Sequence, residues 1–300
     1  MSYDTISFLS DYGHDDEFVG VVHSVIRSLA PTTRVIDITH NIAPHDVRAG
    51  ALTLARSAQY LAPGVVLAVV DPGVGTSRRP IAVEVGEGAS VLVGPDNGLL
   101  APTVALCGGA TRAVELSAPD YRLPAPGATF DGRDVFGPAA AHLCAGVALE
   151  ELGPAIDPGA LVPGMMPVAR DEGDTIVAEV LWVDRFGNCQ LNVDPDDIER
   201  FGEDVSLRFA DSVRSATVAT AYGELGPGVV GLVVDSYGLL SVSLARRSAA
   251  LELGLHVGDE VVLAPSSVDG RSVTTSVQLG RRPSPAGADG AAAGGREAEG

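Results

Sequence analysis

The sequence predicts an α/β domain with a mostly parallel central sheet, followed by a small all-β, barrel-like domain. In the first half of the chain, strand-like apolar runs alternate with helical patterns, as in parallel α/β sheets. Beyond residue 165 the segments shorten and turn residues separate most of them, as in barrels and sandwiches. A stretch rich in Pro and Gly, residues 153–167, indicates a linker. We therefore expect domains at residues 1–165 and 166–280, and a disordered low-complexity tail at 281–300.

Apolar runs in the first domain predict four strands, and polar side chains follow each of them. The runs are residues 6–9, 35–38, 65–70 and 91–93. The polar residues that follow them are Asp11, His40, Asp71, Asp96 and Asn97. Ligands bind at the carboxyl ends of strands in open parallel sheets, so we expect these side chains to share one pocket.

Helical patterns fill the gaps between these runs. Residues 15–29 carry an apolar stripe at helical spacing, with acidic residues in the expected first turn and Pro31 at the end. Residues 44–60 and 134–149 also predict helices. In the second domain the expected strands are residues 175–183, 205–209, 215–219, 229–234, 239–244 and 260–264, with a short helix at 249–255.

The chain is strongly acidic. Its 300 residues include 39 Asp and Glu against 20 Lys and Arg, which gives a net charge of −19. Nucleic-acid binding without sequence preference needs a basic face, so we expect no nucleic-acid partner. No apolar run approaches the ~20 residues of a membrane span, so we expect no membrane partner.

The cysteines and the first residues indicate a cytoplasmic protein. Cys107, Cys144 and Cys189 are odd in number and lack metal-like spacing, which is typical of reduced, buried thiols. The first residues lack the basic region of a signal peptide. Both observations favour the cytoplasm.

Seven motifs, in order along both expected domains, resemble one known family. They are FLSDYG (8–13), DITHNIAPHDVRAGA (37–51), DPGVGTSRR (71–79), GPDNGLL (94–100), TFDGRDVF (129–136), VDRFGN (183–188) and DSYGLLS (235–241). Through them the chain is similar, over most of residues 5–265, to the S-adenosyl-L-methionine (SAM) hydrolases, also called SAM hydroxide adenosyltransferases. That family is related to the SAM-dependent fluorinase and chlorinase.

The resemblance implies a fold, an assembly and a reaction. The fold is an N-terminal α/β domain with a C-terminal β-barrel, and the assembly is a homotrimer. SAM would bind between the N-terminal domain of one subunit and the C-terminal domain of its neighbour. The reaction would be hydrolysis of SAM to adenosine and L-methionine, with SAM as the substrate, no cofactor and no metal.

The family positions and activates water with an Asp, an Arg and a His. Asp71 and Arg78 match the first two, whereas Asp131 stands at the position of the family His. A carboxylate cannot act as a cationic imidazole, but it accepts protons and hydrogen bonds from water. On the residues alone, Asp71 and Arg78 are equally well explained as a salt bridge at a strand end.

The candidates for substrate binding lie in both expected domains. Asp11 suits the two ribose hydroxyls, and Phe186 and Asn188 suit the face and polar edge of adenine. The resemblance places Asp184 and Ser236 at the amino-acid end of methionine. The remaining candidates are Asp16 for the ammonium group, and His45, Val74, Asn97 and Phe130 for the pocket.

Plainer structural roles remain open for several of these residues. Asp11 also fits a turn or a helix cap, and Phe186 and Asn188 fit a tight turn between strands. Arg246 and Arg247 either contact a ligand or face solvent.

Other functions remain open as well. A metal-dependent nucleotide hydrolase would use the cluster of Asp11, His14, Asp15 and Asp16, although acidic residues also suit the start of a helix. A SAM- or adenosine-binding protein without turnover would explain Asp131 in place of the His. A halide nucleophile is disfavoured, because the Asp71 carboxylate would repel it.

Overall fold

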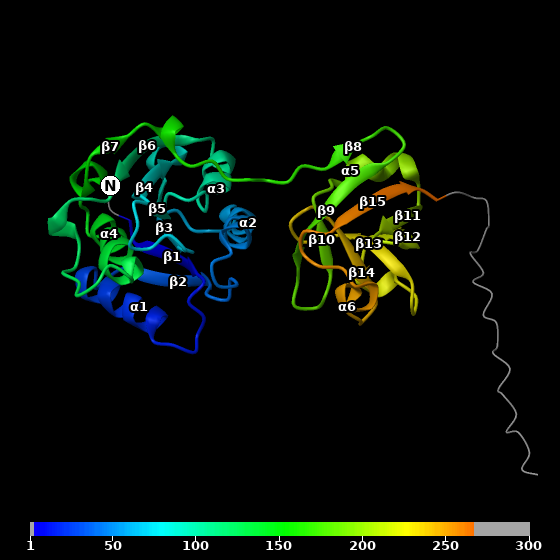
Figure 1. Ribbon diagram of the computed structural model, residues 1–300, viewed down its shortest axis with the longest axis horizontal. Helices are drawn as coiled ribbons and strands as arrows, with labels where there is room; N and C mark the ends of the chain where they lie inside the picture. Colours follow the sequence, from blue (N-terminus) through cyan, green and yellow to red (C-terminus); the bar gives the residue numbers. More distant parts are fainter. Residues whose placement is uncertain (1–2, 267–300) are drawn as a thin grey trace, which may run out of the picture. The chain divides into compact units, whose positions relative to one another are not determined.

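The first part of the molecule is built on a seven-stranded sheet (Figure 1). The computed structural model describes residues 3–266. The strand order is β2-β1-β3-β5-β4-β6-β7. The strands are β1 (Thr5–Ser10), β2 (Arg34–Thr39), β3 (Val65–Val69), β4 (Pro80–Val85), β5 (Ser90–Pro95), β6 (Ala110–Glu115) and β7 (Ala155–Ile156). The first four strands of this order, β2, β1, β3 and β5, pair in parallel, which confirms the predicted α/β sheet.

The other half of this sheet is antiparallel and was not predicted. β4 begins with a proline and both β4 and β6 carry charged residues, so neither forms a continuous apolar run. Glu84 lies opposite Arg112 in the β4–β6 register, and the two side chains form an ion pair. Cross-strand pairing of opposite charges stabilises a sheet, but it is invisible in either segment alone.

Helices cover both faces of the sheet. They are α1 (Phe18–Leu29), α2 (Val47–Ala58), α3 (Ala101–Leu106) and α4 (Gly137–Cys144). α1 packs on α4, and α2 packs on α3. One apolar core includes Phe8, Ile26 and Phe136, and another includes Leu54 and Leu92. Because β1, β3 and β5 are covered on both faces, their side chains are almost all buried.

Three helix boundaries differ from the predicted ones. α1 starts at Phe18, so the acidic residues expected in its first turn precede the helix. α2 starts after Asp46, whose side chain caps it by accepting a hydrogen bond from the Ala49 N–H at 2.8 Å. The segment predicted as a helix from residue 134 opens instead with a π-helical turn, Gly132–Phe136, and α4 ends at Cys144.

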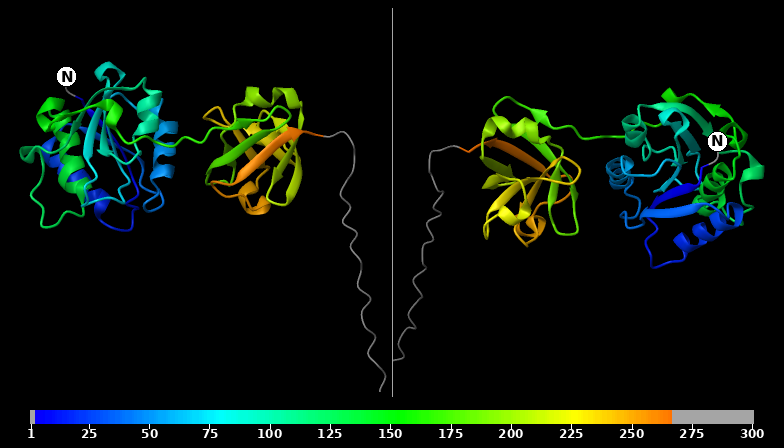
Figure 2. Two further views of the ribbon diagram at one scale, coloured as in Figure 1. Left: turned by 45° about the horizontal axis from the view of Figure 1, so that its top comes forward. Right: turned by 180° about the vertical axis from the view of Figure 1, so that it is seen from behind.

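The second part is a closed β-barrel, which confirms the predicted all-β domain (Figure 2). Its strands are β8 (Arg170–Asp171), β9 (Ile176–Val183), β10 (Cys189–Leu191), β11 (Asp204–Phe209), β12 (Ser212–Ala219), β13 (Val230–Val234), β14 (Leu240–Leu244) and β15 (Glu260–Pro265). The order runs β10-β14-β13-β12-β11-β15-β9-β8, and the pairing of β10 with β9 closes the barrel. Apolar side chains such as Leu191, Leu207 and Val242 fill it.

Short helical segments complete the fold. In the barrel they are α5 (Pro195–Ile198) and α6 (Ala249–Leu253), and α6 matches the helix predicted at residues 249–255. Short 3-10 turns are Gly86–Gly88, Pro119–Tyr121, Leu149–Leu152, Pro158–Ala160, Glu199–Phe201 and Tyr222–Glu224. The tail predicted at residues 281–300 lies outside the described residues. Within residues 3–266, every helix is too short or too polar to cross a bilayer.

We expect Leu67→Ala to lower the free energy of unfolding by about 2–5 kcal/mol. Leu67 is fully buried in β3, at the centre of the sheet, so truncation leaves a cavity. Denaturant unfolding followed by circular dichroism measures the loss. Leu106→Ala is the matched control, because Leu106 is 63% exposed and its truncation should change stability by less than about 0.5 kcal/mol. Equal losses in the two variants would contradict this view of the core.

Candidate active site

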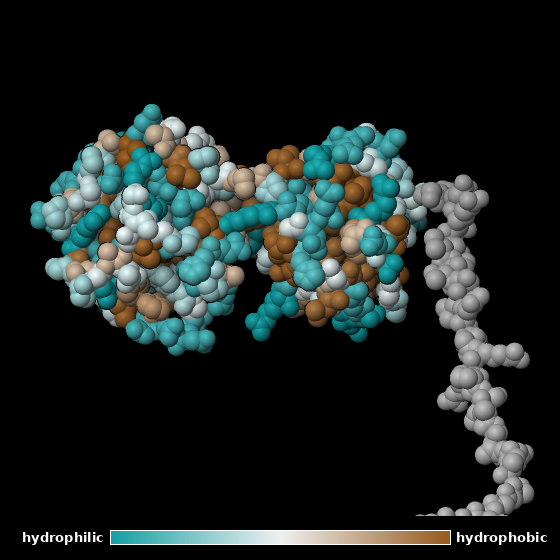
Figure 3. Space-filling view, viewed as in Figure 1, coloured by the Kyte–Doolittle hydropathy of each residue, from teal (hydrophilic) through white to brown (hydrophobic). Residues whose placement is uncertain are grey.

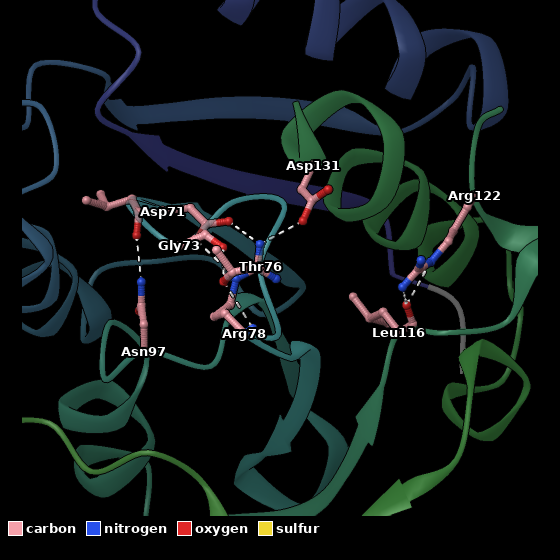
Figure 4. A network of polar contacts seen from close by, with 9 residues as sticks. Asp71, Gly73, Thr76, Arg78, Asn97, Leu116, Arg122 and Asp131 are labelled. Carbon is pink, nitrogen blue, oxygen red and sulfur yellow. Dashed lines mark hydrogen bonds and ion pairs between the residues drawn. The ribbon is translucent and has the colours of Figure 1, made fainter. Parts of the chain in front are cut away.

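The loop after β3 delivers Asp71 and Arg78 to the carboxyl end of the parallel strands (Figure 4). Within the loop the Thr76 hydroxyl donates to the Gly73 carbonyl at 2.6 Å, and the Arg78 N–H donates to the Thr76 hydroxyl at 3.3 Å. Gly75 has φ of +76°, and a Cβ there would lie 2.6 Å from the Ala128 carbonyl oxygen. The glycine is therefore required both by conformation and by space.

Arg78 is held between two carboxylates. Its Nε donates to Asp71 Oδ1 at 3.0 Å and its Nη2 to Asp71 Oδ2, which makes a bidentate pair. Nη2 also donates to Asp131 Oδ2 at 2.7 Å. The side chains of Arg78, Asp71 and Asp131 are only 8%, 5% and 19% exposed. The structure thus brings all three predicted catalytic residues into one cluster.

Among the residues that the structure describes, the third nitrogen of Arg78 has no partner. Nη1 is buried and makes no hydrogen bond within the described part of the chain. The guanidinium carbon lies 5.3 Å from the centre of the Phe136 ring, so one side of the group is covered. A buried charged donor without an acceptor is costly, and such a group marks a place for water or a ligand.

The pKa of Asp71 is shifted upward in this cluster. Burial raises the pKa of Asp71, the Arg78 guanidinium opposes that rise, and the neighbouring Asp131 adds to it. Burial also raises the pKa of Tyr12, helped by the charges of Asp11, Asp71 and Asp131, so the phenol stays neutral. With one cation against two carboxylates, the cluster carries a net negative charge when both acids are ionised.

Asp11 is fixed beside this cluster by the backbone of the loop before α2. Its Oδ2 accepts a hydrogen bond from the His45 N–H at 2.8 Å. His45 adopts a left-handed conformation, with φ of +70°, and its side chain is exposed. Its contact with the predicted site is therefore made through the backbone.

The rings of Phe130, Tyr12 and Phe18 pack against one another near this cluster. Phe130 stands edge-on to Tyr12 and Phe18, with ring centres 5.7 and 5.0 Å away. Val74 is half-buried within the loop after β3, where its N–H donates to the Asp71 carbonyl at 3.3 Å.

The polar groups of Asn97 and His40 are engaged within the fold. The Asn97 amide binds the backbone: Nδ2 donates to the Val70 carbonyl at 2.9 Å, and Oδ1 accepts from the Leu99 N–H at 3.1 Å. His40 is fully buried and turns to Ser10, with Nδ1 2.7 Å from Oγ. Burial lowers the pKa of His40, which keeps the ring neutral near neutral pH. The polar strand ends therefore do not all line one pocket.

The residues considered above as the site of a metal-dependent hydrolase do not form a metal site in the described structure. Asp16 is exposed and makes no side-chain hydrogen bond or ion pair in the described structure. Across residues 3–266, Asp11, His14, Asp15 and Asp16 do not bring three ligand atoms within reach of one ion. One other trio does, formed by His23, Asp37 and His40.

The predicted barrel residues surround a cavity of about 280 Å³. Asp184 organises the turn there: its Oδ1 accepts from the N–H groups of Phe186 and Asn188, both at 2.8 Å, and its Oδ2 from the Asn188 amide at 2.8 Å. The Phe186 ring is 78% exposed, which leaves its face open for stacking. Ser236 lies on the loop between β13 and β14 and lines the same cavity.

Sequence reasoning missed Gln190 and Asp235 in this cavity. Gln190 is 2% exposed, its Nε2 donates to Asp235 Oδ2, and its Oε1 has no hydrogen-bond partner among the described residues. Asp235 Oδ1 accepts from the Tyr237 N–H at 2.8 Å. The signal was present: Asp235 ends the strand-like run at 229–234, as Asp71 ends its own. Trp182 also lines this cavity.

The two arginines left open lie at a neighbouring hollow of the barrel. Arg246 and Arg247 line a cavity of about 450 Å³ together with Phe186 and Asn188. Both are exposed, and Arg247 forms an ion pair with Glu252. Cys107, expected to be buried, is exposed, whereas Cys144 and Cys189 are buried as predicted.

Comparison with known proteins identifies the family. Residues 6–153 match the model of the SAM hydroxide adenosyltransferase N-terminal domain, and residues 178–262 match that of the C-terminal domain. The chain belongs to this family. The resemblance seen in the seven motifs is thereby confirmed.

The chain aligns with nearly the whole length of several curated relatives. A protein of Salinispora tropica named (R)-S-adenosyl-L-methionine hydrolase is 46% identical over 256 residues, which are 85% of this chain and 96% of the relative. A protein of the same name from Thermus thermophilus is 42% identical over 86% of this chain and 98% of its own length. A fluorinase from Actinopolyspora mzabensis is 30% identical over 82% of this chain and 91% of its own.

A solved structure from Thermotoga maritima has a similar fold. It aligns with a TM-score of 0.81 at 33% identity, over 86% of this chain and 99% of the other.

We expect Arg78→Met to destabilise the protein by about 3–5 kcal/mol at pH 7, because two carboxylates with little exposure lose their shared cation. Without the cation the pKa of Asp71 rises further in the folded state. The folded variant then binds protons more readily than the unfolded chain, so its deficit should shrink as the pH falls from 7 to 5. Denaturant unfolding at both pH values measures it. Arg34→Met, at an exposed position of β2, is the control. A deficit independent of pH would contradict the charge argument.

Proposed function

We propose that this protein hydrolyses SAM to adenosine and L-methionine, with water or hydroxide attacking C5′ in line with the C5′–S bond. The family and the names of the curated relatives support the reaction. The observation that carries the proposal is the unpartnered Nη1 of Arg78, buried beside two carboxylates. It offers a fixed donor to the oxygen of a water next to groups that accept protons.

In this reaction the leaving group needs no assistance from the protein, whereas the nucleophile does. SAM is a sulfonium, so methionine departs as a neutral thioether and needs no acid. Water is a weak nucleophile, and holding it in line supplies a large part of the rate enhancement. In this site Arg78 Nη1 would hold the water oxygen and favour its hydroxide character.

Asp131 is the better placed of the two acids to take the proton. Both oxygens of Asp71 are engaged by Arg78, whereas Asp131 gives the cation only Oδ2. Asp131 is also the more exposed of the two, at 19% against 5%. We therefore assign Asp131 as the general base and Asp71 as the residue that orients Arg78. This argument works against a carrier of SAM without turnover, which needs no base.

The same cluster disfavours halide. Two carboxylates against one guanidinium leave excess negative charge where a chloride or fluoride ion would have to lose its water. Water carries no such penalty, and the excess charge attracts the sulfonium cation. No cofactor enters this scheme, because SAM is the substrate.

The substrate would contact residues of the α/β domain and residues of the barrel. Asp11 would bind the ribose hydroxyls beside the Asp71–Arg78–Asp131 cluster, with Asp16, His45, Val74, Asn97 and Phe130 near it. The barrel would hold adenine with Phe186 and Asn188. Ser236 and Asp184 would hold the methionine end, Asp184 through the turn that it organises.

We propose a homotrimer in the cytoplasm as the working form. Apolar side chains reach the surface of the barrel, including Phe186, Tyr222 and Leu251, and brown apolar residues appear on it in Figure 3. An interface with a neighbouring subunit would cover such groups. Light scattering of the purified chain tests the trimer. The three free thiols support a reducing compartment.

We expect purified protein and SAM to give adenosine and methionine at a rate unchanged by excess chelator or chloride. Mass-resolved chromatography of the products measures this, with both sulfonium epimers supplied because the relatives are named for the (R) form. Loss of turnover in chelator would support the metal-dependent alternative. A chlorinated adenosine would contradict the charge argument.

Asp131→Asn should lower kcat by about 10²–10⁴-fold and change KM little, because the amide keeps the shape but cannot accept the proton. Asp131→His should retain more activity, since imidazole is a competent base. Steady-state kinetics on both variants measure the effect. Asp120→Asn is the control, because Asp120 is exposed on the 3-10 turn Pro119–Tyr121 and takes no part in the hydrogen bonds of the cluster. Full activity in Asp131→Asn would remove Asp131 from the mechanism.

A further inference from the structure

Three side chains at the edge of the sheet gather outside the proposed active site. His23 lies on α1, Asp37 on β2, and His40 directly follows β2. Asp37 Oδ1 is 2.9 Å from His23 Nε2 and 3.1 Å from His40 Nε2. All three atoms lie within 4.8 Å of one another, the one such trio among the residues that the structure describes.

An irregularity in β2 makes this convergence possible. Phe8 of β1 pairs with Asp37, but the next residue, Leu9, pairs with Thr39, so one extra residue is inserted in β2. In a regular strand, residues three apart point to opposite faces. The extra residue brings Asp37 and His40 together, and bulges commonly re-aim a side chain in this way.

His40 has a buried nitrogen, Nε2, that faces Asp37 Oδ1 at 3.1 Å. The side chain is 0% exposed, and Nε2 makes no well-directed hydrogen bond although Asp37 Oδ1 is near. The opposite nitrogen, Nδ1, is 2.7 Å from Ser10 Oγ, and the ring stands edge-on to Phe8 at 4.6 Å. The ring is therefore locked, with a lone pair free at Nε2 once Nδ1 carries the proton.

We propose that His23, Asp37 and His40 bind one divalent transition-metal ion of the zinc class. Two imidazoles and one carboxylate are an established ligand set for such ions. Tetrahedral bonds of about 2.0–2.1 Å place ligand atoms about 3.3 Å apart, close to the separations of Asp37 Oδ1 from the two histidines.

Several features of the surroundings suit a metal. Ser10 supplies the outer hydrogen bond that orients a ligating histidine. His23 and Asp37 are 34% and 41% exposed, so an ion has an entry path and water can complete its coordination. The misdirected Nε2 of His40 is expected where two ligands face a common ion rather than each other.

The role of the ion would be structural. It would join α1 to β2 and fix the position of Ser10, the last residue of β1. The proposal does not depend on hydrolysis of SAM, which the mechanism above carries out without a metal. Binding is therefore the property to measure.

The full-length protein, without a histidine tag and freed of metal by chelator, would be titrated with Co²⁺ and with Zn²⁺. Co²⁺ absorption reports the ligand geometry, and calorimetry gives the Zn²⁺ stoichiometry. A Cys107→Ser background removes the exposed thiol as a competing ligand. We expect one ion per chain and a visible Co²⁺ band typical of four-coordinate sites.

His23→Gln is the deciding variant. A glutamine keeps a hydrogen-bond donor for Asp37 but removes the imidazole ligand, at a position of α1 that is 34% exposed. We expect binding at least tenfold weaker, with the far-ultraviolet circular dichroism unchanged. His256→Gln, at an exposed histidine also close to an aspartate, Asp259, should bind as the parent does. No Co²⁺ band, or a band retained in both His23→Gln and Asp37→Asn, would overturn the proposal and leave a hydrogen-bonded trio.

Discussion

The sharing of one buried guanidinium by two carboxylates is the constraint on which the proposed active site depends. Asp71 and Asp131 come from separate segments, and side by side they would repel each other without Arg78. The cation therefore fixes the loop after β3 against the start of the π-helical turn. Since each member holds the others, Arg78 Nη1 is aimed before any ligand arrives. Preorganised donors of this kind are usually the largest single contribution to stabilising charge that develops during a reaction.

Asp131, which stands where the resemblance implies a histidine, would change the charge of the site more than its geometry. The carboxylate reaches Arg78 Nη2 at 2.7 Å, a contact that a cationic imidazole would weaken by repulsion. With Asp71 and Asp131 both ionised, the cluster is one unit more negative than with a neutral histidine. That excess favours the sulfonium cation of SAM and opposes an anionic nucleophile. The exchange is consistent with hydrolysis and gives the acid a part in selecting the nucleophile.

Local patterns predicted most of the fold because most of its strands have apolar sequences that can be recognised without knowing their neighbours. β3 and β5 are apolar runs with Gly and Pro signals beside them. Asp71 and Arg78, which one motif carries, lie together as an ion pair after β3. β4 and β6 escaped prediction because the Glu84–Arg112 pair stabilises them only once they lie together. The part that the Asn97 amide plays in holding the backbone was not predicted either, because residue type does not reveal it.

The end of β1 connects the two polar systems of the first domain. Ser10 Oγ contacts His40 Nδ1 and accepts from the Tyr12 N–H at 3.3 Å, and the residue between them, Asp11, holds the loop at His45. Any ion that fixes His40 would thereby fix Ser10 and the backbone that carries Asp11. Hydrogen-bond geometry tolerates only a few tenths of an ångström, so a small shift of Ser10 would move the carboxylate assigned to the ribose. The proposed metal would thus support substrate positioning while taking no part in the chemical step.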